Sequence, residues 1–144
     1  MRRAAAALFI GVVLGVPGAG RAHAQNGGRS LADGVFSKAQ AERGRDVFTE
    51  TCSVCHTRGQ FTDGTFRRNW EGRTLFDVFE QLRSTMPNDS PGRLSGQEYL
   101  DVLLYLFSQQ GYPAGEVEIS ATADTLRQIR ITPPPPGKES RGRG

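Results

Sequence analysis

The sequence predicts an all-α fold, a small helical domain, and three observations lead to this prediction. A capping box, or a looser form of one, opens three segments, at Ser37, Thr74 and Ser95. Apolar residues follow the second and third of these openings at helical spacing, and strand-like alternation is limited to the short stretch at Val117 and Ile119. The length of 144 residues and a charged fraction of 23% fit one soluble domain.

The first 24 residues have the three parts of a secretory signal peptide. Arg2 and Arg3 give a positive start, an uncharged run follows over 4–16, and the tripeptide 22–24 offers small residues at the positions that a signal peptidase reads. The alternative is a membrane anchor, which needs about 18 or more apolar residues, and this run is shorter. We therefore expect export to the periplasm, cleavage after about Ala24 and no stable membrane anchor.

Cleavage would change the charge of the protein. The full chain has 18 basic and 15 acidic residues, and three arginines but no acidic residue precede the expected cleavage point. The mature chain would therefore balance 15 basic against 15 acidic residues. The basic pI of about 9.2 therefore belongs mostly to the expected signal peptide and gives no support for a nucleic-acid partner, and we expect none.

The first half of the mature chain predicts a lead-in, one helix and a long loop. Residues 25–36 begin with a glycine-rich, polar stretch and predict a flexible lead-in. A helix is expected from Ser37 to about Glu50, because Ser37 and Gln40 form the pattern of a capping box. The tract 57–73 contains three glycines and few periodic apolar residues, so it predicts a long loop.

The second half predicts two further helices. The first runs from Thr74 to about Ser84 and is followed by a proline-bearing loop over 85–94. The second runs from Ser95 to near Gly111, and glycine is a typical helix stop. The predicted regions of the chain are a cleaved signal peptide (1–24), a flexible lead-in (25–36), a helical domain (37–115), a C-terminal wrap with a short helix near 121–129 (116–132) and a disordered tail rich in Pro, Gly and Arg (133–144).

The strongest chemical signal is the pattern Cys-x-x-Cys-His, formed by Cys52, Cys55 and His56. This pattern is typical of c-type haem attachment. Two thiols three positions apart can add to the two vinyl groups on one side of a porphyrin, and the adjacent imidazole then lies below the iron. The sequence therefore predicts one haem c, bound covalently through Cys52 and Cys55, with His56 as a metal ligand.

Three other interpretations of the cysteine pair have less support. A thioredoxin-like pair follows a strand and precedes a helix, whereas here a predicted helix precedes it and a glycine-bearing loop follows. A zinc site usually has four protein ligands when it is structural and three when it is catalytic, and the mature chain offers at most Cys52, Cys55 and His56 as thiol or imidazole ligands. A disulfide across two residues is strained. An exported protein would also tend to oxidise an unattached pair, which favours haem attachment.

Met86 is the candidate for the second metal ligand. It would be the single methionine of the mature chain, and it lies 30 residues after His56. Pro87 disfavours the helical state for Met86 and predicts an extended backbone, from which the thioether could reach the open face of the ring. The alternative is that Met86 fills a gap in the core. Its position in a proline-bearing loop makes that role a poorer fit.

Together with these motifs, segment 37–115 resembles the class I c-type cytochromes. Gly44 and Phe48 are similar to positions of that family's first helix, where a glycine allows close helix crossing and an aromatic residue packs beneath the haem. Tyr99 and Tyr105 resemble the aromatic residues of its last helix, and Thr85-Met86-Pro87 resembles its distal loop. The resemblance implies a small cytochrome c-like helical domain around one covalently bound haem.

Three short segments resemble a smaller group within this family. The segments 86–87, 91–95 and 111–115 are similar to the monohaem cytochromes and cytochrome domains associated with quinoprotein dehydrogenases. One departure concerns His56. Many family members have Gly-Pro soon after the histidine, with a backbone carbonyl that fixes its other ring nitrogen, whereas residues 57–60 are Thr-Arg-Gly-Gln. The group that orients His56 is therefore not identified from the sequence.

The resemblance implies an electron carrier of the respiratory chain rather than an enzyme. Its partners would be redox proteins, a quinoprotein dehydrogenase or a terminal oxidase. The alternative is a haem c protein with an open distal site, peroxidatic or gas-sensing, which would apply if Met86 did not bind iron. Trp70 is a candidate hydrogen-bond donor to a haem propionate, with Arg67 or Arg68 on the other. Candidate walls of the haem pocket are Phe48, Phe61, Phe66, Leu75, Phe76, Phe79, Leu82 and Leu94.

Overall fold

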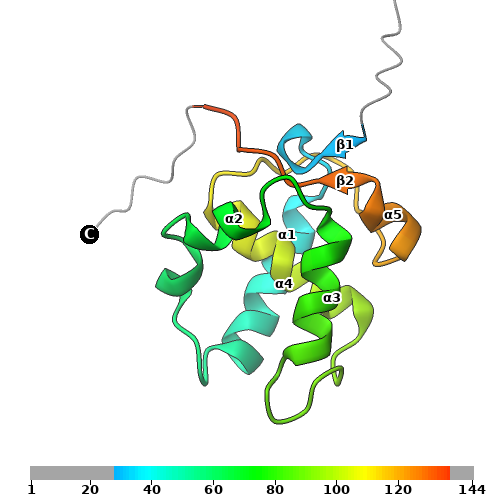
Figure 1. Ribbon diagram of the computed structural model, residues 1–144. Coiled ribbons are helices and arrows are strands. Elements are labelled where there is room, and N and C mark those ends of the chain that lie inside the picture. The colour runs from blue at the N-terminus through cyan, green and yellow to red at the C-terminus, as the bar shows by residue number, and fades with distance from the viewer. Residues whose placement is uncertain (1–27, 137–144) are drawn as a thin grey trace, which may run out of the picture.

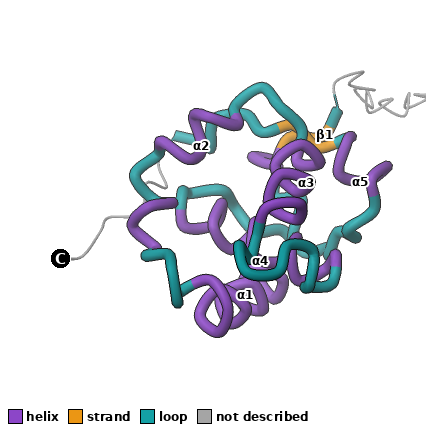
Figure 2. The backbone as a smooth tube through the Cα atoms, turned by 60° about the horizontal axis from the view of Figure 1, so that its bottom comes forward, coloured by secondary structure: helices purple, strands orange, loops and turns teal. Residues whose placement is uncertain are grey.

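The computed structural model describes residues 28–136, and helices form just over half of these residues (Figure 1). The elements in chain order are β1 (Arg29–Ser30), η1 (Leu31–Asp33), α1 (Lys38–Val47), η2 (Phe48–Cys52), η3 (Arg58–Phe61), α2 (Thr65–Trp70), α3 (Leu75–Thr85), α4 (Gly96–Gln109), α5 (Ala123–Arg127) and β2 (Ile129–Arg130). Figure 2 shows how short the paired strands are beside the helices. The predicted all-α fold is confirmed.

The three predicted helix starts carry the capping boxes that the sequence indicates. At each start, a serine or threonine hydroxyl accepts a hydrogen bond from the amide three residues later, and the side chain of that later residue accepts one from the cap amide. The pairs are Ser37 with Gln40, Thr74 with Asp77, and Ser95 with Glu98. These starts were predictable because every atom involved lies within four consecutive residues.

Helices α1 and α4 cross at Gly44, where their backbones meet. A Cβ atom at position 44 would lie 1.8 Å from the carbonyl oxygen of Asp101 and 2.8 Å from the amide nitrogen of Val102. Only glycine leaves room for this contact, which is the close crossing implied by the resemblance to class I cytochromes. All residues of α4 from Tyr99 to Phe107 are buried, so this helix is the centre of the core.

The structure differs from the predicted flexible lead-in. Strand β1 pairs in parallel with β2, and Leu31 and Phe36 are fully buried. Burying a large apolar side chain contributes about 1.5–3 kcal/mol, so Leu31 and Phe36, together with the pairing to β2, offset much of the conformational entropy lost when the segment is ordered. The prediction was wrong for residues 29–36 because the strand and core that receive them come from distant parts of the chain.

The end of the first helix agrees with the prediction, whereas the tract after it differs. The π-helical turn η2 continues α1 to Cys52, close to the expected end near Glu50. The tract 57–73 is not a plain loop, because it contains η3 and α2. Both elements are only four to six residues long, too short to show an apolar period in the sequence.

The C-terminal wrap packs against α3. Helix α5 lies within the expected 121–129, and Leu126, Ile129 and Ile131 are fully buried. The amide of Gly72 donates to the carbonyl of Ile131 at 2.8 Å, and the amide of Ile131 donates to the carbonyl of Arg73 at 2.9 Å. These bonds tie the wrap to the turn that starts α3.

Two predicted regions fall wholly or mostly beyond this structure. The expected signal peptide, 1–24, lies outside the described residues, as does segment 137–144 of the expected tail. Residues 133–136 contain neither helix nor strand. Within 28–136, none of the helices combines the length and the apolar character that crossing a membrane requires.

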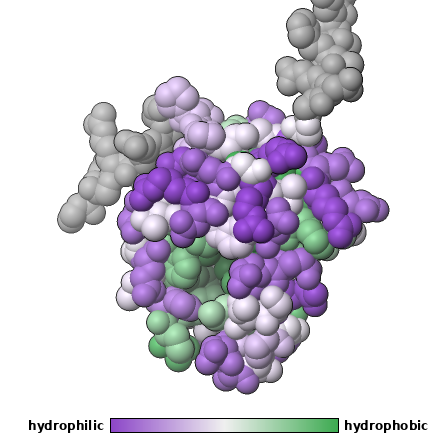
Figure 3. Space-filling model, in the orientation of Figure 1, coloured by the Kyte–Doolittle hydropathy of each residue, from purple (hydrophilic) through white to green (hydrophobic). Residues whose placement is uncertain are grey.

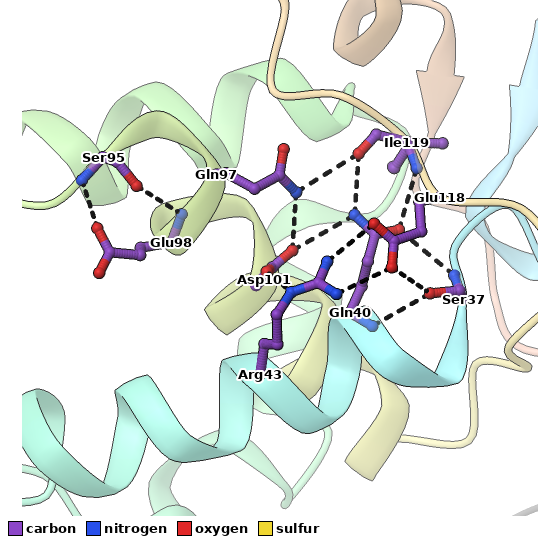
Figure 4. A network of polar contacts seen from close by, with 9 residues as sticks. All are labelled: Ser37, Gln40, Arg43, Ser95, Gln97, Glu98, Asp101, Glu118 and Ile119. Carbon is purple, nitrogen blue, oxygen red and sulfur yellow. Dashed lines mark hydrogen bonds and ion pairs between the residues drawn. The ribbon is translucent and has the colours of Figure 1, made fainter.

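A buried polar network joins the wrap to the helix crossing (Figure 4). The Asp101 carboxylate, 3% exposed, accepts hydrogen bonds from Nε2 of Gln40 at 3.3 Å and from Nε of Arg43 at 2.8 Å. Gln40 also holds Ile119 of the wrap, because its Nε2 donates to the Ile119 carbonyl at 2.9 Å and its Oε1 accepts from the Ile119 amide at 3.0 Å. The network satisfies these buried polar groups and fixes the wrap on α1 and α4.

The ion pair between Arg43 and Glu118, at the edge of this network, is expected to make the free energy of unfolding depend on pH. Arg43 donates to both carboxylate oxygens of Glu118, at 2.9 and 3.0 Å, and this bonding is the main cause that holds the pKa of Glu118 below its usual range. Because the folded-state pKa is lower than the unfolded-state pKa of about 4.3, the ion pair contributes its full stabilisation at pH values above the unfolded-state pKa. This contribution is lost as the pH falls through the folded-state pKa.

We therefore expect Glu118→Gln to lower the free energy of unfolding slightly at pH 7 and by less at pH 3, measured by urea unfolding at both values. Glu116→Gln is the matched control, because Glu116 is an exposed neighbour for which no ion pair is found among the described residues. A loss for Glu118→Gln that is the same at both pH values would contradict the expectation.

Candidate functional site

One face of the domain is hollowed by an apolar cavity of about 680 Å³. Figure 3 shows hydrophobic surface, in green, around this hollow. The volume lies in the range of about 300–1,000 Å³ that is usual for small-molecule and cofactor sites. Its large apolar lining residues are Phe48, Phe61, Phe66, Trp70, Val78, Leu82, Leu94, Val102, Leu103 and Leu106. The expected pocket walls that pack in or against the core instead are Leu75, Phe76 and Phe79.

The Cys-x-x-Cys-His segment forms a turn at this cavity. Cys52 ends η2, and its carbonyl accepts hydrogen bonds from the amides of Cys55 at 3.2 Å and His56 at 3.0 Å. All three side chains line the cavity. No disulfide joins the two cysteines, of which Cys52 is half-buried and Cys55 is exposed. Burial raises the pKa of the Cys52 thiol, and the positive charge of Arg93 opposes that shift.

The His56 ring lies against a row of aromatic side chains. Its centroid is 5.4 Å from that of Phe61, in an edge-on arrangement. Phe61 in turn contacts Phe48 at 6.1 Å and Phe66 at 5.5 Å, both edge-on. Within the described part of the chain, Phe61 is the aromatic ring found against the imidazole, and no hydrogen bond to the imidazole is found. Sequence reasoning could not name this partner, because Phe61 lies five residues beyond His56 in a tract without periodicity.

Met86 reaches the same cavity from the end of α3. Its side chain lines the cavity, and its backbone is extended, with φ −128° and ψ 152°. The extended backbone predicted from Pro87 is confirmed. The Met86 amide donates to the Leu82 carbonyl at 2.9 Å, and the Met86 carbonyl accepts a 2.7 Å hydrogen bond from the Tyr99 hydroxyl. This contact with Tyr99 had no signal in the sequence.

Trp70 also lines the cavity, whereas the two arginines before it have other partners. Arg67 forms an ion pair with Glu71, and Arg68 donates to a threonine hydroxyl at the start of α2. Arg93 lines the cavity although sequence reasoning did not single it out. Arg93 lies in segment 91–95, which contributed to the narrower resemblance, but nothing in the sequence placed its side chain at the cavity.

Comparison with known families adds the deciding observation. Residues 39–106 match the family model described as cytochrome C oxidase, cbb3-type, subunit III. The matched segment is a class I c-type cytochrome domain. It contains Cys52, Cys55, His56 and Met86 together with α1 to most of α4. No curated protein and no solved structure gave a significant match to the chain.

A class I c-type cytochrome domain carries haem c bound covalently. The cavity of this cytochrome fits such a group, because its lining is largely apolar and includes two cysteines, a histidine and a methionine. Thiol, imidazole and thioether are the groups that attach haem c and ligate its iron. For zinc the donor set fits less well, since residues 28–136 hold no group of three or more His, Cys, Asp or Glu placed to bind a metal ion.

Proposed function

We propose that this cytochrome is a periplasmic carrier of single electrons between a dehydrogenase and a downstream acceptor. The proposal is supported chiefly by one observation: Cys52, Cys55, His56 and Met86 line one apolar cavity, although they are spread over 35 residues of the chain. Cys52 and Cys55 would hold haem c through thioethers, and His56 and Met86 would occupy the two axial positions. Bound haem supplies an iron that takes up and gives back one electron.

The chain itself would provide a rigid and largely dry environment. Aromatic and aliphatic side chains form most of the cavity wall, and they exclude water that would otherwise reorganise when the charge of the site changes. Two axial ligands from the protein leave no position for a substrate. His/Met ligation also favours the reduced state and so places the potential on the high side for haem proteins.

The exposed edge of the site would be the point of electron exchange. Cys55 is exposed, and Val54, between the two cysteines, is 80% exposed and lines the cavity mouth. A redox partner could therefore approach the attached edge of the ring closely. We propose a quinoprotein dehydrogenase as donor, from the narrower resemblance of the loops, and a terminal oxidase as acceptor. The family model supports the second, since its description names an oxidase subunit.

The optical spectrum of the purified ferric protein tests the axial assignment. The wild-type protein is expected to be six-coordinate and low-spin, with the weak sulfur-to-iron band. Met86→Ala is expected to abolish that band and give a high-spin spectrum that shifts when imidazole is added, because the thioether is lost. Asn88→Ala is the control, since it alters the same loop and cavity wall but removes no proposed ligand.

Two results would contradict the proposal. A wild-type spectrum that is already high-spin and shifts with small ligands would favour a haem protein with an open distal site, peroxidatic or gas-sensing. A Met86→Ala spectrum identical to that of the wild type would exclude Met86 as a ligand.

A further inference from the structure

Tyr99 of α4 contacts the main chain of Met86, which lies at the end of a different helix. The Tyr99 hydroxyl donates a 2.7 Å hydrogen bond to the Met86 carbonyl. Tyr99 is only 1% exposed, and its ring packs edge-on against Phe79 of α3, with the centroids 6.5 Å apart. Because the ring is enclosed in this way, the hydroxyl has a fixed position relative to both helices.

The backbone of Met86 is consequently held on both sides of its Cα atom. Its amide is bonded to the Leu82 carbonyl, in the last turn of α3, and its carbonyl is bonded to Tyr99. The side chain between these two bonds lines the cavity. The direction of the thioether therefore depends on α4 as well as on α3.

We propose that Tyr99 is a positioning residue, whose hydroxyl holds the Met86 carbonyl so that the thioether stays directed at the haem iron. This inference rests on the proposed function, because it requires Met86 to be an axial ligand. A single neutral hydrogen bond of this kind shifts an equilibrium by about three- to tenfold. Without it, the thioether would leave its position more often, and an added ligand would compete more successfully.

The test is a titration of the full ferric holoprotein with imidazole, followed by the optical spectrum. Tyr99→Phe keeps the ring and removes only the hydroxyl, so we expect imidazole to bind about three- to tenfold more tightly than to wild type. Tyr105→Phe is the matched control, because Tyr105 is buried on the same helix with its ring against Phe48, and no hydrogen bond of its hydroxyl is found within residues 28–136. This control is expected to leave the affinity unchanged.

The same substitution in Met86→Ala protein tests whether Tyr99 acts by positioning Met86 or by a general effect on the cavity. In Met86→Ala protein, Tyr99→Phe is expected to leave imidazole affinity unchanged, because no thioether remains to be held. A change of affinity in that background would mean that Tyr99 acts on the added ligand directly, and would overturn the inference.

Two further outcomes distinguish a failure of the positioning role of Tyr99 from a failure of the proposed function. If wild type shows methionine ligation but Tyr99→Phe binds imidazole no more tightly than Tyr105→Phe, the positioning role fails and the proposed function stands. If Met86→Ala leaves the spectrum of the wild type unchanged, both fail together.

Discussion

A protein with serine in place of both Cys52 and Cys55 is expected to lose all covalently attached haem. Exported wild-type protein should have the mass of the processed polypeptide plus one haem in denaturing intact-mass analysis, because thioether bonds survive unfolding. The double variant should show the polypeptide mass alone. A haem bound only by the cavity and the axial ligands is released once the fold is lost.

Ser53→Ala is the control for this experiment, since it changes the same turn and leaves both thiols in place. The Ser53 hydroxyl donates to the Thr49 carbonyl, so the control also tests whether local disturbance of η2 alone prevents attachment. Haem that remained with the denatured double variant would refute attachment through Cys52 and Cys55.

Gly44→Ala is expected to destabilise the protein by about 2 kcal/mol, the difference between an overpacking cost near the upper end of its usual range and the gain in helix propensity. Alanine has a higher helix propensity than glycine by about 1 kcal/mol, which would favour the variant in an isolated helix. Here the new Cβ atom would lie 1.8 Å from the carbonyl oxygen of Asp101, so α1 and α4 would have to separate. Overpacking of this kind costs about 1–3 kcal/mol or more and outweighs the gain in propensity, because backbone atoms cannot rotate away.

The free energy of unfolding in urea measures this effect. Gly59→Ala is the matched control, because the nearest atom to a Cβ at position 59 is the Thr57 hydroxyl oxygen at 4.0 Å. We expect this control to change stability by less than about 0.5 kcal/mol. Equal unfolding midpoints for the two variants would show that the helix crossing tolerates separation.

The parts of the fold that were predicted from the sequence depend on local interactions. The starts of α1, α3 and α4 were predicted because a capping box is complete within four residues. The segment 29–36 was predicted incorrectly, because its composition resembles that of a loose terminus and its order comes from β2, about one hundred positions away. The short helix α2 was missed because six residues carry no period.

In the candidate site, too, the features that were predicted from the sequence are the local ones. The spacing of Cys52, Cys55 and His56 points to haem attachment without any knowledge of the fold, since the three residues act within one turn. Met86 could be predicted as an axial ligand because it would be the single methionine of the mature chain and precedes Pro87. The sequence does not indicate which helix packs against it. The hydrogen bond from Tyr99 and the ring contact from Phe61 are visible only when α4 and the tract after His56 have been packed around the cavity.

The sequence by itself therefore determined the helical class, the helix starts and the thiol–imidazole motif, because each of these depends on residues only a few positions apart. Tertiary structure alone decided which side chains surround the motif, how closely α1 and α4 approach, and what holds Met86 in place. Those contacts join residues far apart along the chain, and their energies arise from close packing and from hydrogen bonds that exist only after the helices have met.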